Sequence, residues 1–335
     1  MASARADQSS GFRYNSGFFA QAVFMHAQPM GFQQQAEEAL NELVTLQDLI
    51  RWAVSRMAEQ EVFHGHGSDN PWDEALYLVA HALNLPWQLA QEWQQSRTTR
   101  SERQIVMAFL EQRLVHKVPT PYLTGEAWFC GQPYLVDERV LIPRSPIGEL
   151  INQRFSPWWP EDKEPARIMD LCTGSGCIGI ACAYEFESAQ VELLDISFDA
   201  LEVAEENIAN HRMDDRVMAL QSDLFAAASG KYDIIVSNPP YVDAEDMASL
   251  PEEYQHEPEL ALAAGDDGLD LVHIMLAQAA EYLTDDGIFI LEVGNSFPAL
   301  QEAYPELPFE WPDFEYGGHG VCVLRAADLK AISAK

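Results

Sequence analysis

Hydrophobic and polar positions follow two periods in the second half of the chain. From Arg167 onward, short runs of apolar residues alternate with longer segments in which apolar residues recur every three or four positions. The runs RIMDLC, QVELLDI, RVMALQSD, KYDIIVSN and GIFILEVG indicate strands. Their alternation with helices is typical of a parallel sheet covered on both faces. The last segment, FEWPDFEYGGHGVCVLRA, predicts two strands around a glycine turn, so we expect an antiparallel hairpin at the sheet edge.

The first half of the chain has a helical period instead. Apolar residues recur at helical spacing after Thr45, and Asp48 is placed to complete a capping box. Further helices are predicted over 71–83, 86–95 and 101–116, and alternation with glycine turns predicts a β-hairpin within 119–142. The segment PRSPIGELI then begins another helix. We therefore divide the chain into a loose extension (1–42), a helical domain (43–118), a bridging hairpin (119–143) and an α/β domain (144–335).

The chain carries a large excess of acidic residues. Of its 335 residues, 53 are Asp or Glu and 20 are Lys or Arg, which gives a formal net charge of −33. Such a field repels phosphate backbones and attracts basic partners. We therefore expect no direct DNA binding and a basic protein as partner. Solubility of the surface would explain the acidity equally well, and the sequence leaves both explanations open.

Several sequence features that would indicate a membrane protein, a secreted protein or a metal site are missing. The sequence has no run of about 18 apolar residues and no basic-then-apolar N-terminal pattern, so we expect neither a membrane span nor secretion but a cytoplasmic location. The five cysteines form no C-x-x-C pair, which disfavours a disulfide framework and a zinc site. His64 and His66 lie among glycines without evident further ligands, so we expect a turn there and no metal.

A glycine-rich loop follows the first strand of the α/β domain. In DLCTGSGCIG, residues Gly174, Gly176 and Gly179 satisfy G-x-G-x-x-G, in which glycines admit a ligand to a helix N-terminus. Asp195 closes the second strand, where it could accept hydrogen bonds from both hydroxyls of a ribose. These features serve a nicotinamide cofactor and S-adenosylmethionine equally, and a tight turn without a ligand is the remaining alternative.

Residues at the ends of the other strands distinguish between the two cofactors. Asp223 follows the third strand, where its carboxylate could accept an adenine amino proton, and Leu224 and Phe225 could wall the ring. A hydride-transferring enzyme would need a proton donor or acceptor facing the cofactor, and no residue is evidently placed for that role. Methyl transfer chiefly requires alignment of a nucleophile and exclusion of water. The sequence therefore favours methyl transfer.

The fourth strand runs into SNPPYV, where two prolines prevent the sheet from continuing. Asn238 then lies at the carboxyl end of a strand, where open α/β sheets bind ligands. Its amide oxygen and the backbone carbonyl of Pro239 could accept both protons of an NH₂ group, while Tyr241 holds the attached planar group. This clamp would favour the positive charge that develops on nitrogen during methylation. A plain proline-rich loop exit is the alternative.

The motifs DLCTGSG, LLDIS, QSDLF and SNPPYV, in this order and spacing, resemble the class I S-adenosylmethionine-dependent methyltransferases of the protein-glutamine type. The resemblance implies a Rossmann-like, mostly parallel seven-stranded sheet with an antiparallel C-terminal hairpin, and an N-terminal helical domain that recognises the substrate. It also implies methylation of a glutamine side-chain amide, with S-adenosyl-L-homocysteine as product. GHGSDNPWDEA, YLTGEAWFCG and VDERVLIPRSP are similar to the branch that modifies ribosomal protein L-three; modification of peptide release factors is the alternative.

The resemblance and the motifs together predict the site residues. The predicted cofactor contacts are Asp170, Thr173, Gly174, Gly176, Asp195, Asp223, Leu224, Phe225 and Asn238. The predicted catalytic residues are Asn238, Pro239 and Tyr241, and the predicted substrate contacts are Arg144, Asn238, Pro239, Pro240 and Tyr241. The chain departs from the family pattern at two positions: Cys172 stands where many relatives have glycine, and Leu224 where an aromatic residue is frequent in the release-factor branch.

Several alternatives stay open at this point. Adenine-N6 methyltransferases of nucleic acids use a similar clamp, although the net charge and the lack of a basic region argue against them. A binding module without turnover would keep the fold, but the intact clamp and loop argue against lost activity. Glu292, at the end of the fifth strand, could support the site or simply be solvated. Trp128, Phe129 and Tyr134 could line a protein-docking groove or pack between domains.

Overall fold

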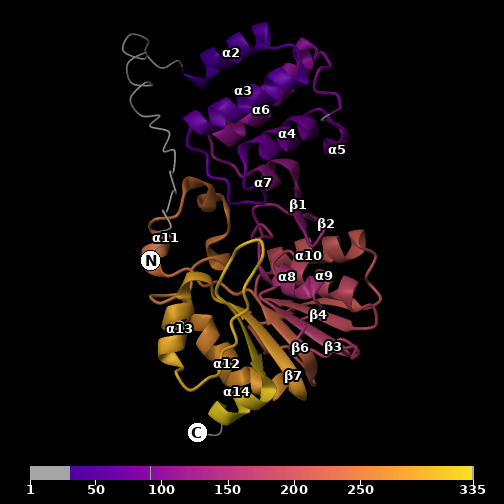
Figure 1. Ribbon diagram of the computed structural model, residues 1–335, viewed down its shortest axis with the longest axis vertical. Helices are drawn as coiled ribbons and strands as arrows, with labels where there is room; N and C mark the ends of the chain where they lie inside the picture. Colours follow the sequence, from indigo (N-terminus) through magenta and orange to yellow (C-terminus); the bar gives the residue numbers. More distant parts are fainter. Residues whose placement is uncertain (1–30, 91, 334–335) are drawn as a thin grey trace, which may run out of the picture. The chain divides into compact units, whose positions relative to one another are not determined.

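The computed structural model describes residues 31–90 and 92–333 (Figure 1). Contacts divide the chain into two units, with the boundary between Leu43 and Val44. The described part of the first unit is the helix α2 (Phe32–Glu42), which lies within the predicted extension 1–42. Residues 1–30 lie outside the described residues. None of the described helices combines the length and the apolar character needed to cross a membrane.

The second unit begins with the helices α3 (Leu46–Glu59), α4 (Pro71–Ala82) and α6 (Arg100–Leu114), which pack against one another. The predicted capping box is confirmed: Thr45 Oγ1 accepts from the Asp48 N–H, and Asp48 Oδ2 accepts from the Thr45 N–H at 3.0 Å. The helix predicted over 86–95 is wrong in length, since α5 covers only Trp87–Ala90. The chain turns there because the carbonyls of Gln94 and Ser96 accept hydrogen bonds from the first turn of α3.

A short connecting region follows the helices. It contains α7 (Thr120–Thr124), the strands β1 (Glu126–Phe129) and β2 (Gln132–Leu135), and α8 (Ile147–Asn152). The antiparallel pairing of β1 with β2 confirms the predicted hairpin. Helix α7 was not predicted; it ends at Gly125, whose φ of 70° stops the helix.

The remaining chain forms a sheet of six strands within the described residues: β3 (Arg167–Leu171), β4 (Gln190–Asp195), β5 (Val217–Gln221), β6 (Tyr232–Ser237), β7 (Leu283–Glu292) and β8 (Val321–Arg325). Their order is β5-β4-β3-β6-β7-β8, and only β8 is antiparallel to its neighbour. This mixed sheet confirms the predicted fold class.

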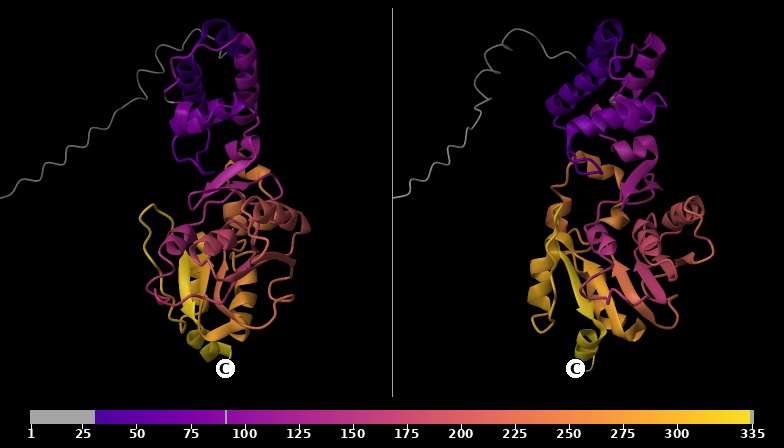
Figure 2. Two further views of the ribbon diagram at one scale, coloured as in Figure 1. Left: turned by 90° about the vertical axis from the view of Figure 1, so that its right-hand side faces the viewer. Right: turned by 45° about the vertical axis from the view of Figure 1, so that its right-hand side comes forward.

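Helices cover both faces of the sheet (Figure 2). Helices α8, α9 (Cys177–Glu185) and α10 (Phe198–Asn210) bury one face, and α12 (Asp270–Tyr282), α13 (Phe297–Ala303) and α14 (Ala326–Ser333) bury the other. Neighbouring residues of a strand point to opposite faces, so Ile168 packs in the first core and Met169 in the second. The sheet is therefore buried on both sides, as its uninterrupted apolar runs predict.

The prediction of a seventh strand is wrong for the described residues, whose sheet has six strands. The place of this strand in the predicted hairpin is taken by a single antiparallel bridge between Glu310 and Val323. Pro308 and Pro312 flank Glu310 and cannot donate a backbone hydrogen bond. The ladder therefore does not extend beyond one pair.

The order of strands reverses between β3 and β6. From β3 the chain proceeds outward through β4 and β5, and then returns to β6 on the other side of β3. Leu171 pairs with both Leu194 of β4 and Ser237 of β6. The segments that follow these three strands therefore leave the same edge of the sheet at adjacent positions, the place where doubly wound sheets bind ligands.

Candidate active site

The loop between β3 and α9 turns sharply. Its φ angles are left-handed at Cys172 (57°), Gly174 (55°) and Gly176 (82°); glycine adopts them without strain, whereas Cys172 does not. A Cβ built on Gly179 would lie 2.1 Å from Leu193 Cδ2, so this glycine allows α9 to pack closely on the sheet. A Cβ on Gly174 would meet no described atom within 4 Å. The loop thus borders open space.

Two carboxylates fix this loop. Asp170 Oδ2 accepts from Thr173 Oγ1 at 2.5 Å and from the Gly179 N–H at 2.9 Å. Burial raises the pKa of Asp170 to about 7 against these two hydrogen bonds, and its Oδ1 is buried without a partner among the described residues. Asp195 accepts from the N–H groups of Gly174 and Ser197, both at 2.9 Å, and burial raises its pKa. Both predicted carboxylates therefore lie at the glycine loop.

The residues after β5 divide between surface and core. Asp223 is exposed, and Leu224 is largely buried with a left-handed φ of 46°. Phe225 is only 1% exposed, and its ring stacks on Tyr282 with centroids 4.7 Å apart. The ring of Phe225 therefore belongs to the same buried core cluster as Leu224 and presents no open face to a ligand.

Asn238 follows β6 with an acceptor that the protein does not use. The preceding Ser237 donates to the Leu171 carbonyl at 2.8 Å, which ties the end of β6 to β3. Asn238 Oδ1 is buried and has no hydrogen-bond partner in the described chain. Pro239 and Pro240, which follow Asn238 in the chain, are also buried. A buried amide oxygen without a partner is unfavourable by about 1–3 kcal/mol, so its retention points to a ligand that donates to it.

Tyr241 is held by a buried carboxyl group. Its hydroxyl donates to Glu292 Oε1 at 3.0 Å, and Ser145 Oγ donates to Glu292 Oε2 at 2.5 Å. Burial raises the pKa of Glu292 to about 7, although both hydrogen bonds favour the charged form. Glu292 thus joins the SNPPYV segment to the segment before α8, and of its two predicted roles the structure favours support of the site.

The raised pKa of Glu292 predicts a pH-dependent stability. A carboxyl group whose pKa rises from 4.5 to about 7 on folding binds its proton more tightly in the folded state. The free energy of unfolding therefore decreases as the pH rises through this range, and the full loss is reached above about pH 7. We expect Glu292→Gln to gain up to about 3 kcal/mol relative to the wild type across this window, measured by urea unfolding. The exposed variant Glu302→Gln is the control; a Glu292→Gln difference that is independent of pH would contradict the prediction.

Arg144 reaches a partner that the sequence did not indicate. Its guanidinium donates to both carboxylate oxygens of Glu257, at 2.6 and 2.7 Å, and lies 5.1 Å from the ring centroid of Tyr254. Burial disfavours the charged form of Glu257, but the neighbouring His66 and Arg144 lower its pKa to about 2. His66 Nε2 is 3.5 Å from Glu257 Oε2. Because 113 residues separate Arg144 from Glu257, nothing in the local sequence signals the pair.

A second buried ion cluster surrounds Arg113 of α6. Its guanidinium contacts Glu74 of α4 at 2.5 Å and Glu253 at 3.1 Å. Glu253 belongs to η1 (Glu252–His256), in the segment after SNPPYV. His64 pairs with the other oxygen of Glu74, and no group of three or more possible metal ligands occurs among the described residues. The HGHG segment is thus part of the contact between the helices and the α/β part of the second unit.

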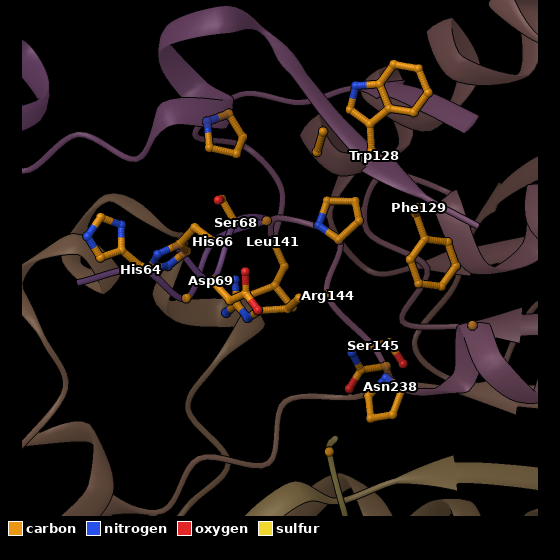
Figure 3. Close-up of a pocket in the computed structure, with 18 of the residues that line it drawn as sticks. His64, His66, Ser68, Asp69, Trp128, Phe129, Leu141, Arg144, Ser145 and Asn238 are labelled. Atoms are coloured by element: carbon orange, nitrogen blue, oxygen red, sulfur yellow. The ribbon is translucent and has the colours of Figure 1, made fainter. Parts of the chain in front are cut away.

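One large pocket of about 1570 Å³ lies along this contact (Figure 3). Its walls include Asn238, Pro239, Tyr241, Arg144 and residues of α4, α5 and β1. The glycine loop and Asp195 do not line it. Asn238 therefore connects two regions: the edge of the sheet that bears the glycine loop, and the pocket.

For the aromatic residues of the hairpin, the sequence left two roles open, lining a groove or packing in the interior, and the structure shows both. Trp128 is 43% exposed and lines the pocket, as does the largely buried Phe129, whereas Tyr134 is fully buried in the core. Packing and the lining of a groove are thus both present in this cluster.

Comparison with known proteins agrees with this geometry. Residues 160–253 match the model of the family described as "Methyltransferase small domain". The chain is 48% identical to the ribosomal protein uL3 glutamine methyltransferase of Francisella tularensis, over 89% of this chain and 95% of that protein. It is 45% identical to the protein of the same name from Neisseria gonorrhoeae, over 86% of this chain and 96% of that protein. The chain is a methyltransferase and belongs to the family of ribosomal protein uL3 glutamine methyltransferases.

Proposed function

We propose that this enzyme transfers a methyl group from S-adenosylmethionine to the side-chain amide nitrogen of a glutamine in ribosomal protein uL3, the L-three protein expected from the sequence. The observation that carries the proposal is the buried, unpartnered Oδ1 of Asn238. It lies at the strand-order reversal and lines a pocket large enough for a peptide segment. A ribosomal protein as substrate also implies that the enzyme acts in the cytoplasm.

The loop residues fit S-adenosylmethionine. The open space at Gly174 leaves room for a ligand beside the loop. The carboxylate oxygens of Asp195 each accept one backbone hydrogen bond and can each accept another from a ribose hydroxyl. Asp170 Oδ1 is a further buried acceptor, and Asp223 and Leu224 remain the predicted adenine contacts. The bound cofactor supplies a methyl group already activated by a positively charged sulfur.

The SNPPYV segment performs the alignment. An amide nitrogen is a poor nucleophile because its lone pair is delocalised into the carbonyl. Asn238 Oδ1 and the Pro239 carbonyl would accept hydrogen bonds from the two N–H groups of the glutamine and stabilise the positive charge that develops on nitrogen. The bond between methyl and sulfur would break as the bond between methyl and nitrogen forms, and the methylated nitrogen would then lose one of its two protons to solvent. Tyr241, fixed through Glu292, would hold the planar carboxamide in orientation. The buried prolines keep the two acceptors rigid.

Cofactor binding depends on Asp195 under this proposal. We expect Asp195→Ala to weaken binding of S-adenosyl-L-homocysteine by about 10- to 100-fold, since it removes both ribose acceptors and the hydrogen bond that fixes Gly174. Calorimetry measures the dissociation constant directly. Asp199→Ala, in the first turn of α10, is the control and should bind normally. A dissociation constant for Asp195→Ala within twofold of the wild type would exclude a ribose contact.

The proposed activity is tested with purified uL3 and labelled S-adenosylmethionine. We expect stoichiometric transfer of one methyl group, which mass spectrometry assigns to one glutamine. A uL3 variant with alanine at that position should take up no label. Equal labelling of both forms would defeat the assignment.

A further inference from the structure

Four residues form a recess in the pocket wall, which we call the aromatic recess: Tyr77 of α4, Trp87 of α5, and Glu126 and Trp128 of β1. The two tryptophans are 41% and 43% exposed, and their ring centroids lie 6.4 Å apart at an interplanar angle of 79°. Large aromatic side chains that remain exposed inside a pocket leave apolar ring surface for a ligand.

The carboxylate of Glu126 is fixed within this recess. Its Oε1 accepts from Tyr77 Oη at 2.7 Å and from Trp128 Nε1 at 3.1 Å. Burial and the hydrogen bond to Glu126 raise the pKa of Tyr77 to about 12, so the phenol remains a donor. Both bonds use the same oxygen, and Oε2 makes no hydrogen bond with the described chain. The recess therefore presents an oriented carboxylate oxygen beside two aromatic rings.

The chemistry of the recess selects a cation. Aromatic faces attract ammonium and guanidinium groups, and a carboxylate accepts charge-assisted hydrogen bonds from them. The charge of the whole pocket points the same way: besides Glu74, which pairs with Arg113, and Glu292, whose pKa is raised by burial, its walls contain five aspartates and glutamates but one arginine, Arg144. That arginine is already paired with Glu257. A phosphate group would be repelled, whereas a basic side chain would be attracted.

The recess is separate from the position of the acceptor amide. In Figure 3, Trp128 lies at the upper edge of the pocket, and Asn238 lies with Ser145 at the lower edge. A glutamine side chain held at Asn238 would therefore leave the recess to another residue of the same substrate. A protein segment can fill both positions at once.

We propose that the aromatic recess binds an arginine or lysine side chain of the substrate protein that flanks the acceptor glutamine. This inference rests on the proposed function, because it takes the substrate to be a protein. It gives the helical part of the enzyme a direct role in specificity. It also gives one of the many acidic residues, Glu126, a direct contact with a basic partner.

The first test compares recess variants with matched controls, using the full chain and purified uL3. We expect Trp128→Ala and Glu126→Gln each to raise both the dissociation constant and the KM for uL3 about tenfold, with kcat within about twofold. Glu126→Gln keeps an acceptor for Tyr77 and Trp128, so it preserves the local structure. Trp93→Ala and Glu92→Gln change exposed residues outside the pocket and should behave as the wild type.

The second test identifies the cation. Each Arg and Lys near the methylated glutamine of uL3 is replaced by Gln in turn, and one replacement should reproduce the loss of affinity. Combined with Glu126→Gln, that replacement should cause no further loss. The inference would be overturned if both recess variants kept the wild-type dissociation constant, or if the losses caused by Glu126→Gln and by the uL3 replacement were fully additive. In either case, methylation of uL3 by the unaltered enzyme would leave the proposed function intact. Absence of methylation by the unaltered enzyme would instead reject the proposed function and this inference with it.

Discussion

Replacement of Asn238 with alanine is expected to lower kcat for uL3 methylation by about 10²- to 10³-fold, the loss typical when one oriented polar group is removed from a charged transition state. The side chain has no structural hydrogen bond through Oδ1 to lose, so folding should be retained. Affinity for S-adenosyl-L-homocysteine should stay within a few-fold of the wild type, because most of the proposed cofactor contacts lie elsewhere, on the glycine loop and at Asp195, Asp223 and Leu224. Single-turnover kinetics and calorimetry measure the two quantities.

The matched control for this variant is Asn210→Ala, an exposed asparagine at the end of α10. It should leave kcat and cofactor affinity unchanged. If Asn238→Ala kept more than about a tenth of the wild-type kcat, the amide oxygen would not be a principal acceptor. A large loss of cofactor binding with little change in the chemical step would also contradict the proposed division of roles.

Loss of Arg113 is expected to produce the largest change in stability. Its side chain is 1% exposed and lies between Glu74 and Glu253, which are themselves buried. Arg113→Leu would leave Glu253 without its ion-pair partner and Glu74 with His64 alone, in the contact that forms the pocket. Removal of one partner from a buried ion pair typically costs about 3–5 kcal/mol, and we expect a loss of this size in urea unfolding at neutral pH.

Two further variants show whether the loss comes from unpaired charge. Arg97→Leu removes an exposed arginine and should change the free energy of unfolding by less than about 0.5 kcal/mol. Addition of Glu74→Gln and Glu253→Gln to Arg113→Leu should restore part of the stability, because neither unpaired carboxylate of this cluster then remains. A loss below about 1 kcal/mol in Arg113→Leu itself would show that the cluster is solvated rather than buried.

Local patterns predicted most of the fold. The capping box at Thr45, the five parallel strands and the helices between them follow from periodicity and capping, which depend only on residues close together in the sequence. The SNPPYV segment and the glycine loop were likewise recognisable, because their prolines and glycines restrict the backbone directly. The prediction of a seventh strand was wrong for a local reason as well, because Pro308 and Pro312 limit the pairing beside β8 to one bridge.

The partners that organise the site could not be predicted in this way. Glu257 pairs with Arg144 across 113 residues, Glu253 with Arg113 across 140, and Ser145 with Glu292 across 147. No periodic pattern encodes such pairs, because they depend on the packing of the helices against the sheet. The same packing separates Trp128, which lines the pocket, from Tyr134, which is buried in the core, although both belong to the seven-residue segment WFCGQPY.

The proposed methyl transfer requires an amide held by the Asn238 and Pro239 carbonyls beside the methyl donor. A crystal structure with S-adenosyl-L-homocysteine and a glutamine peptide from uL3 tests it most directly. We expect the glutamine nitrogen within hydrogen-bonding distance of Asn238 Oδ1, about 2.7–3.2 Å, and the sulfur of the product directed at that nitrogen. A sulfur directed elsewhere, or a glutamine bound away from Asn238, would contradict the central claim.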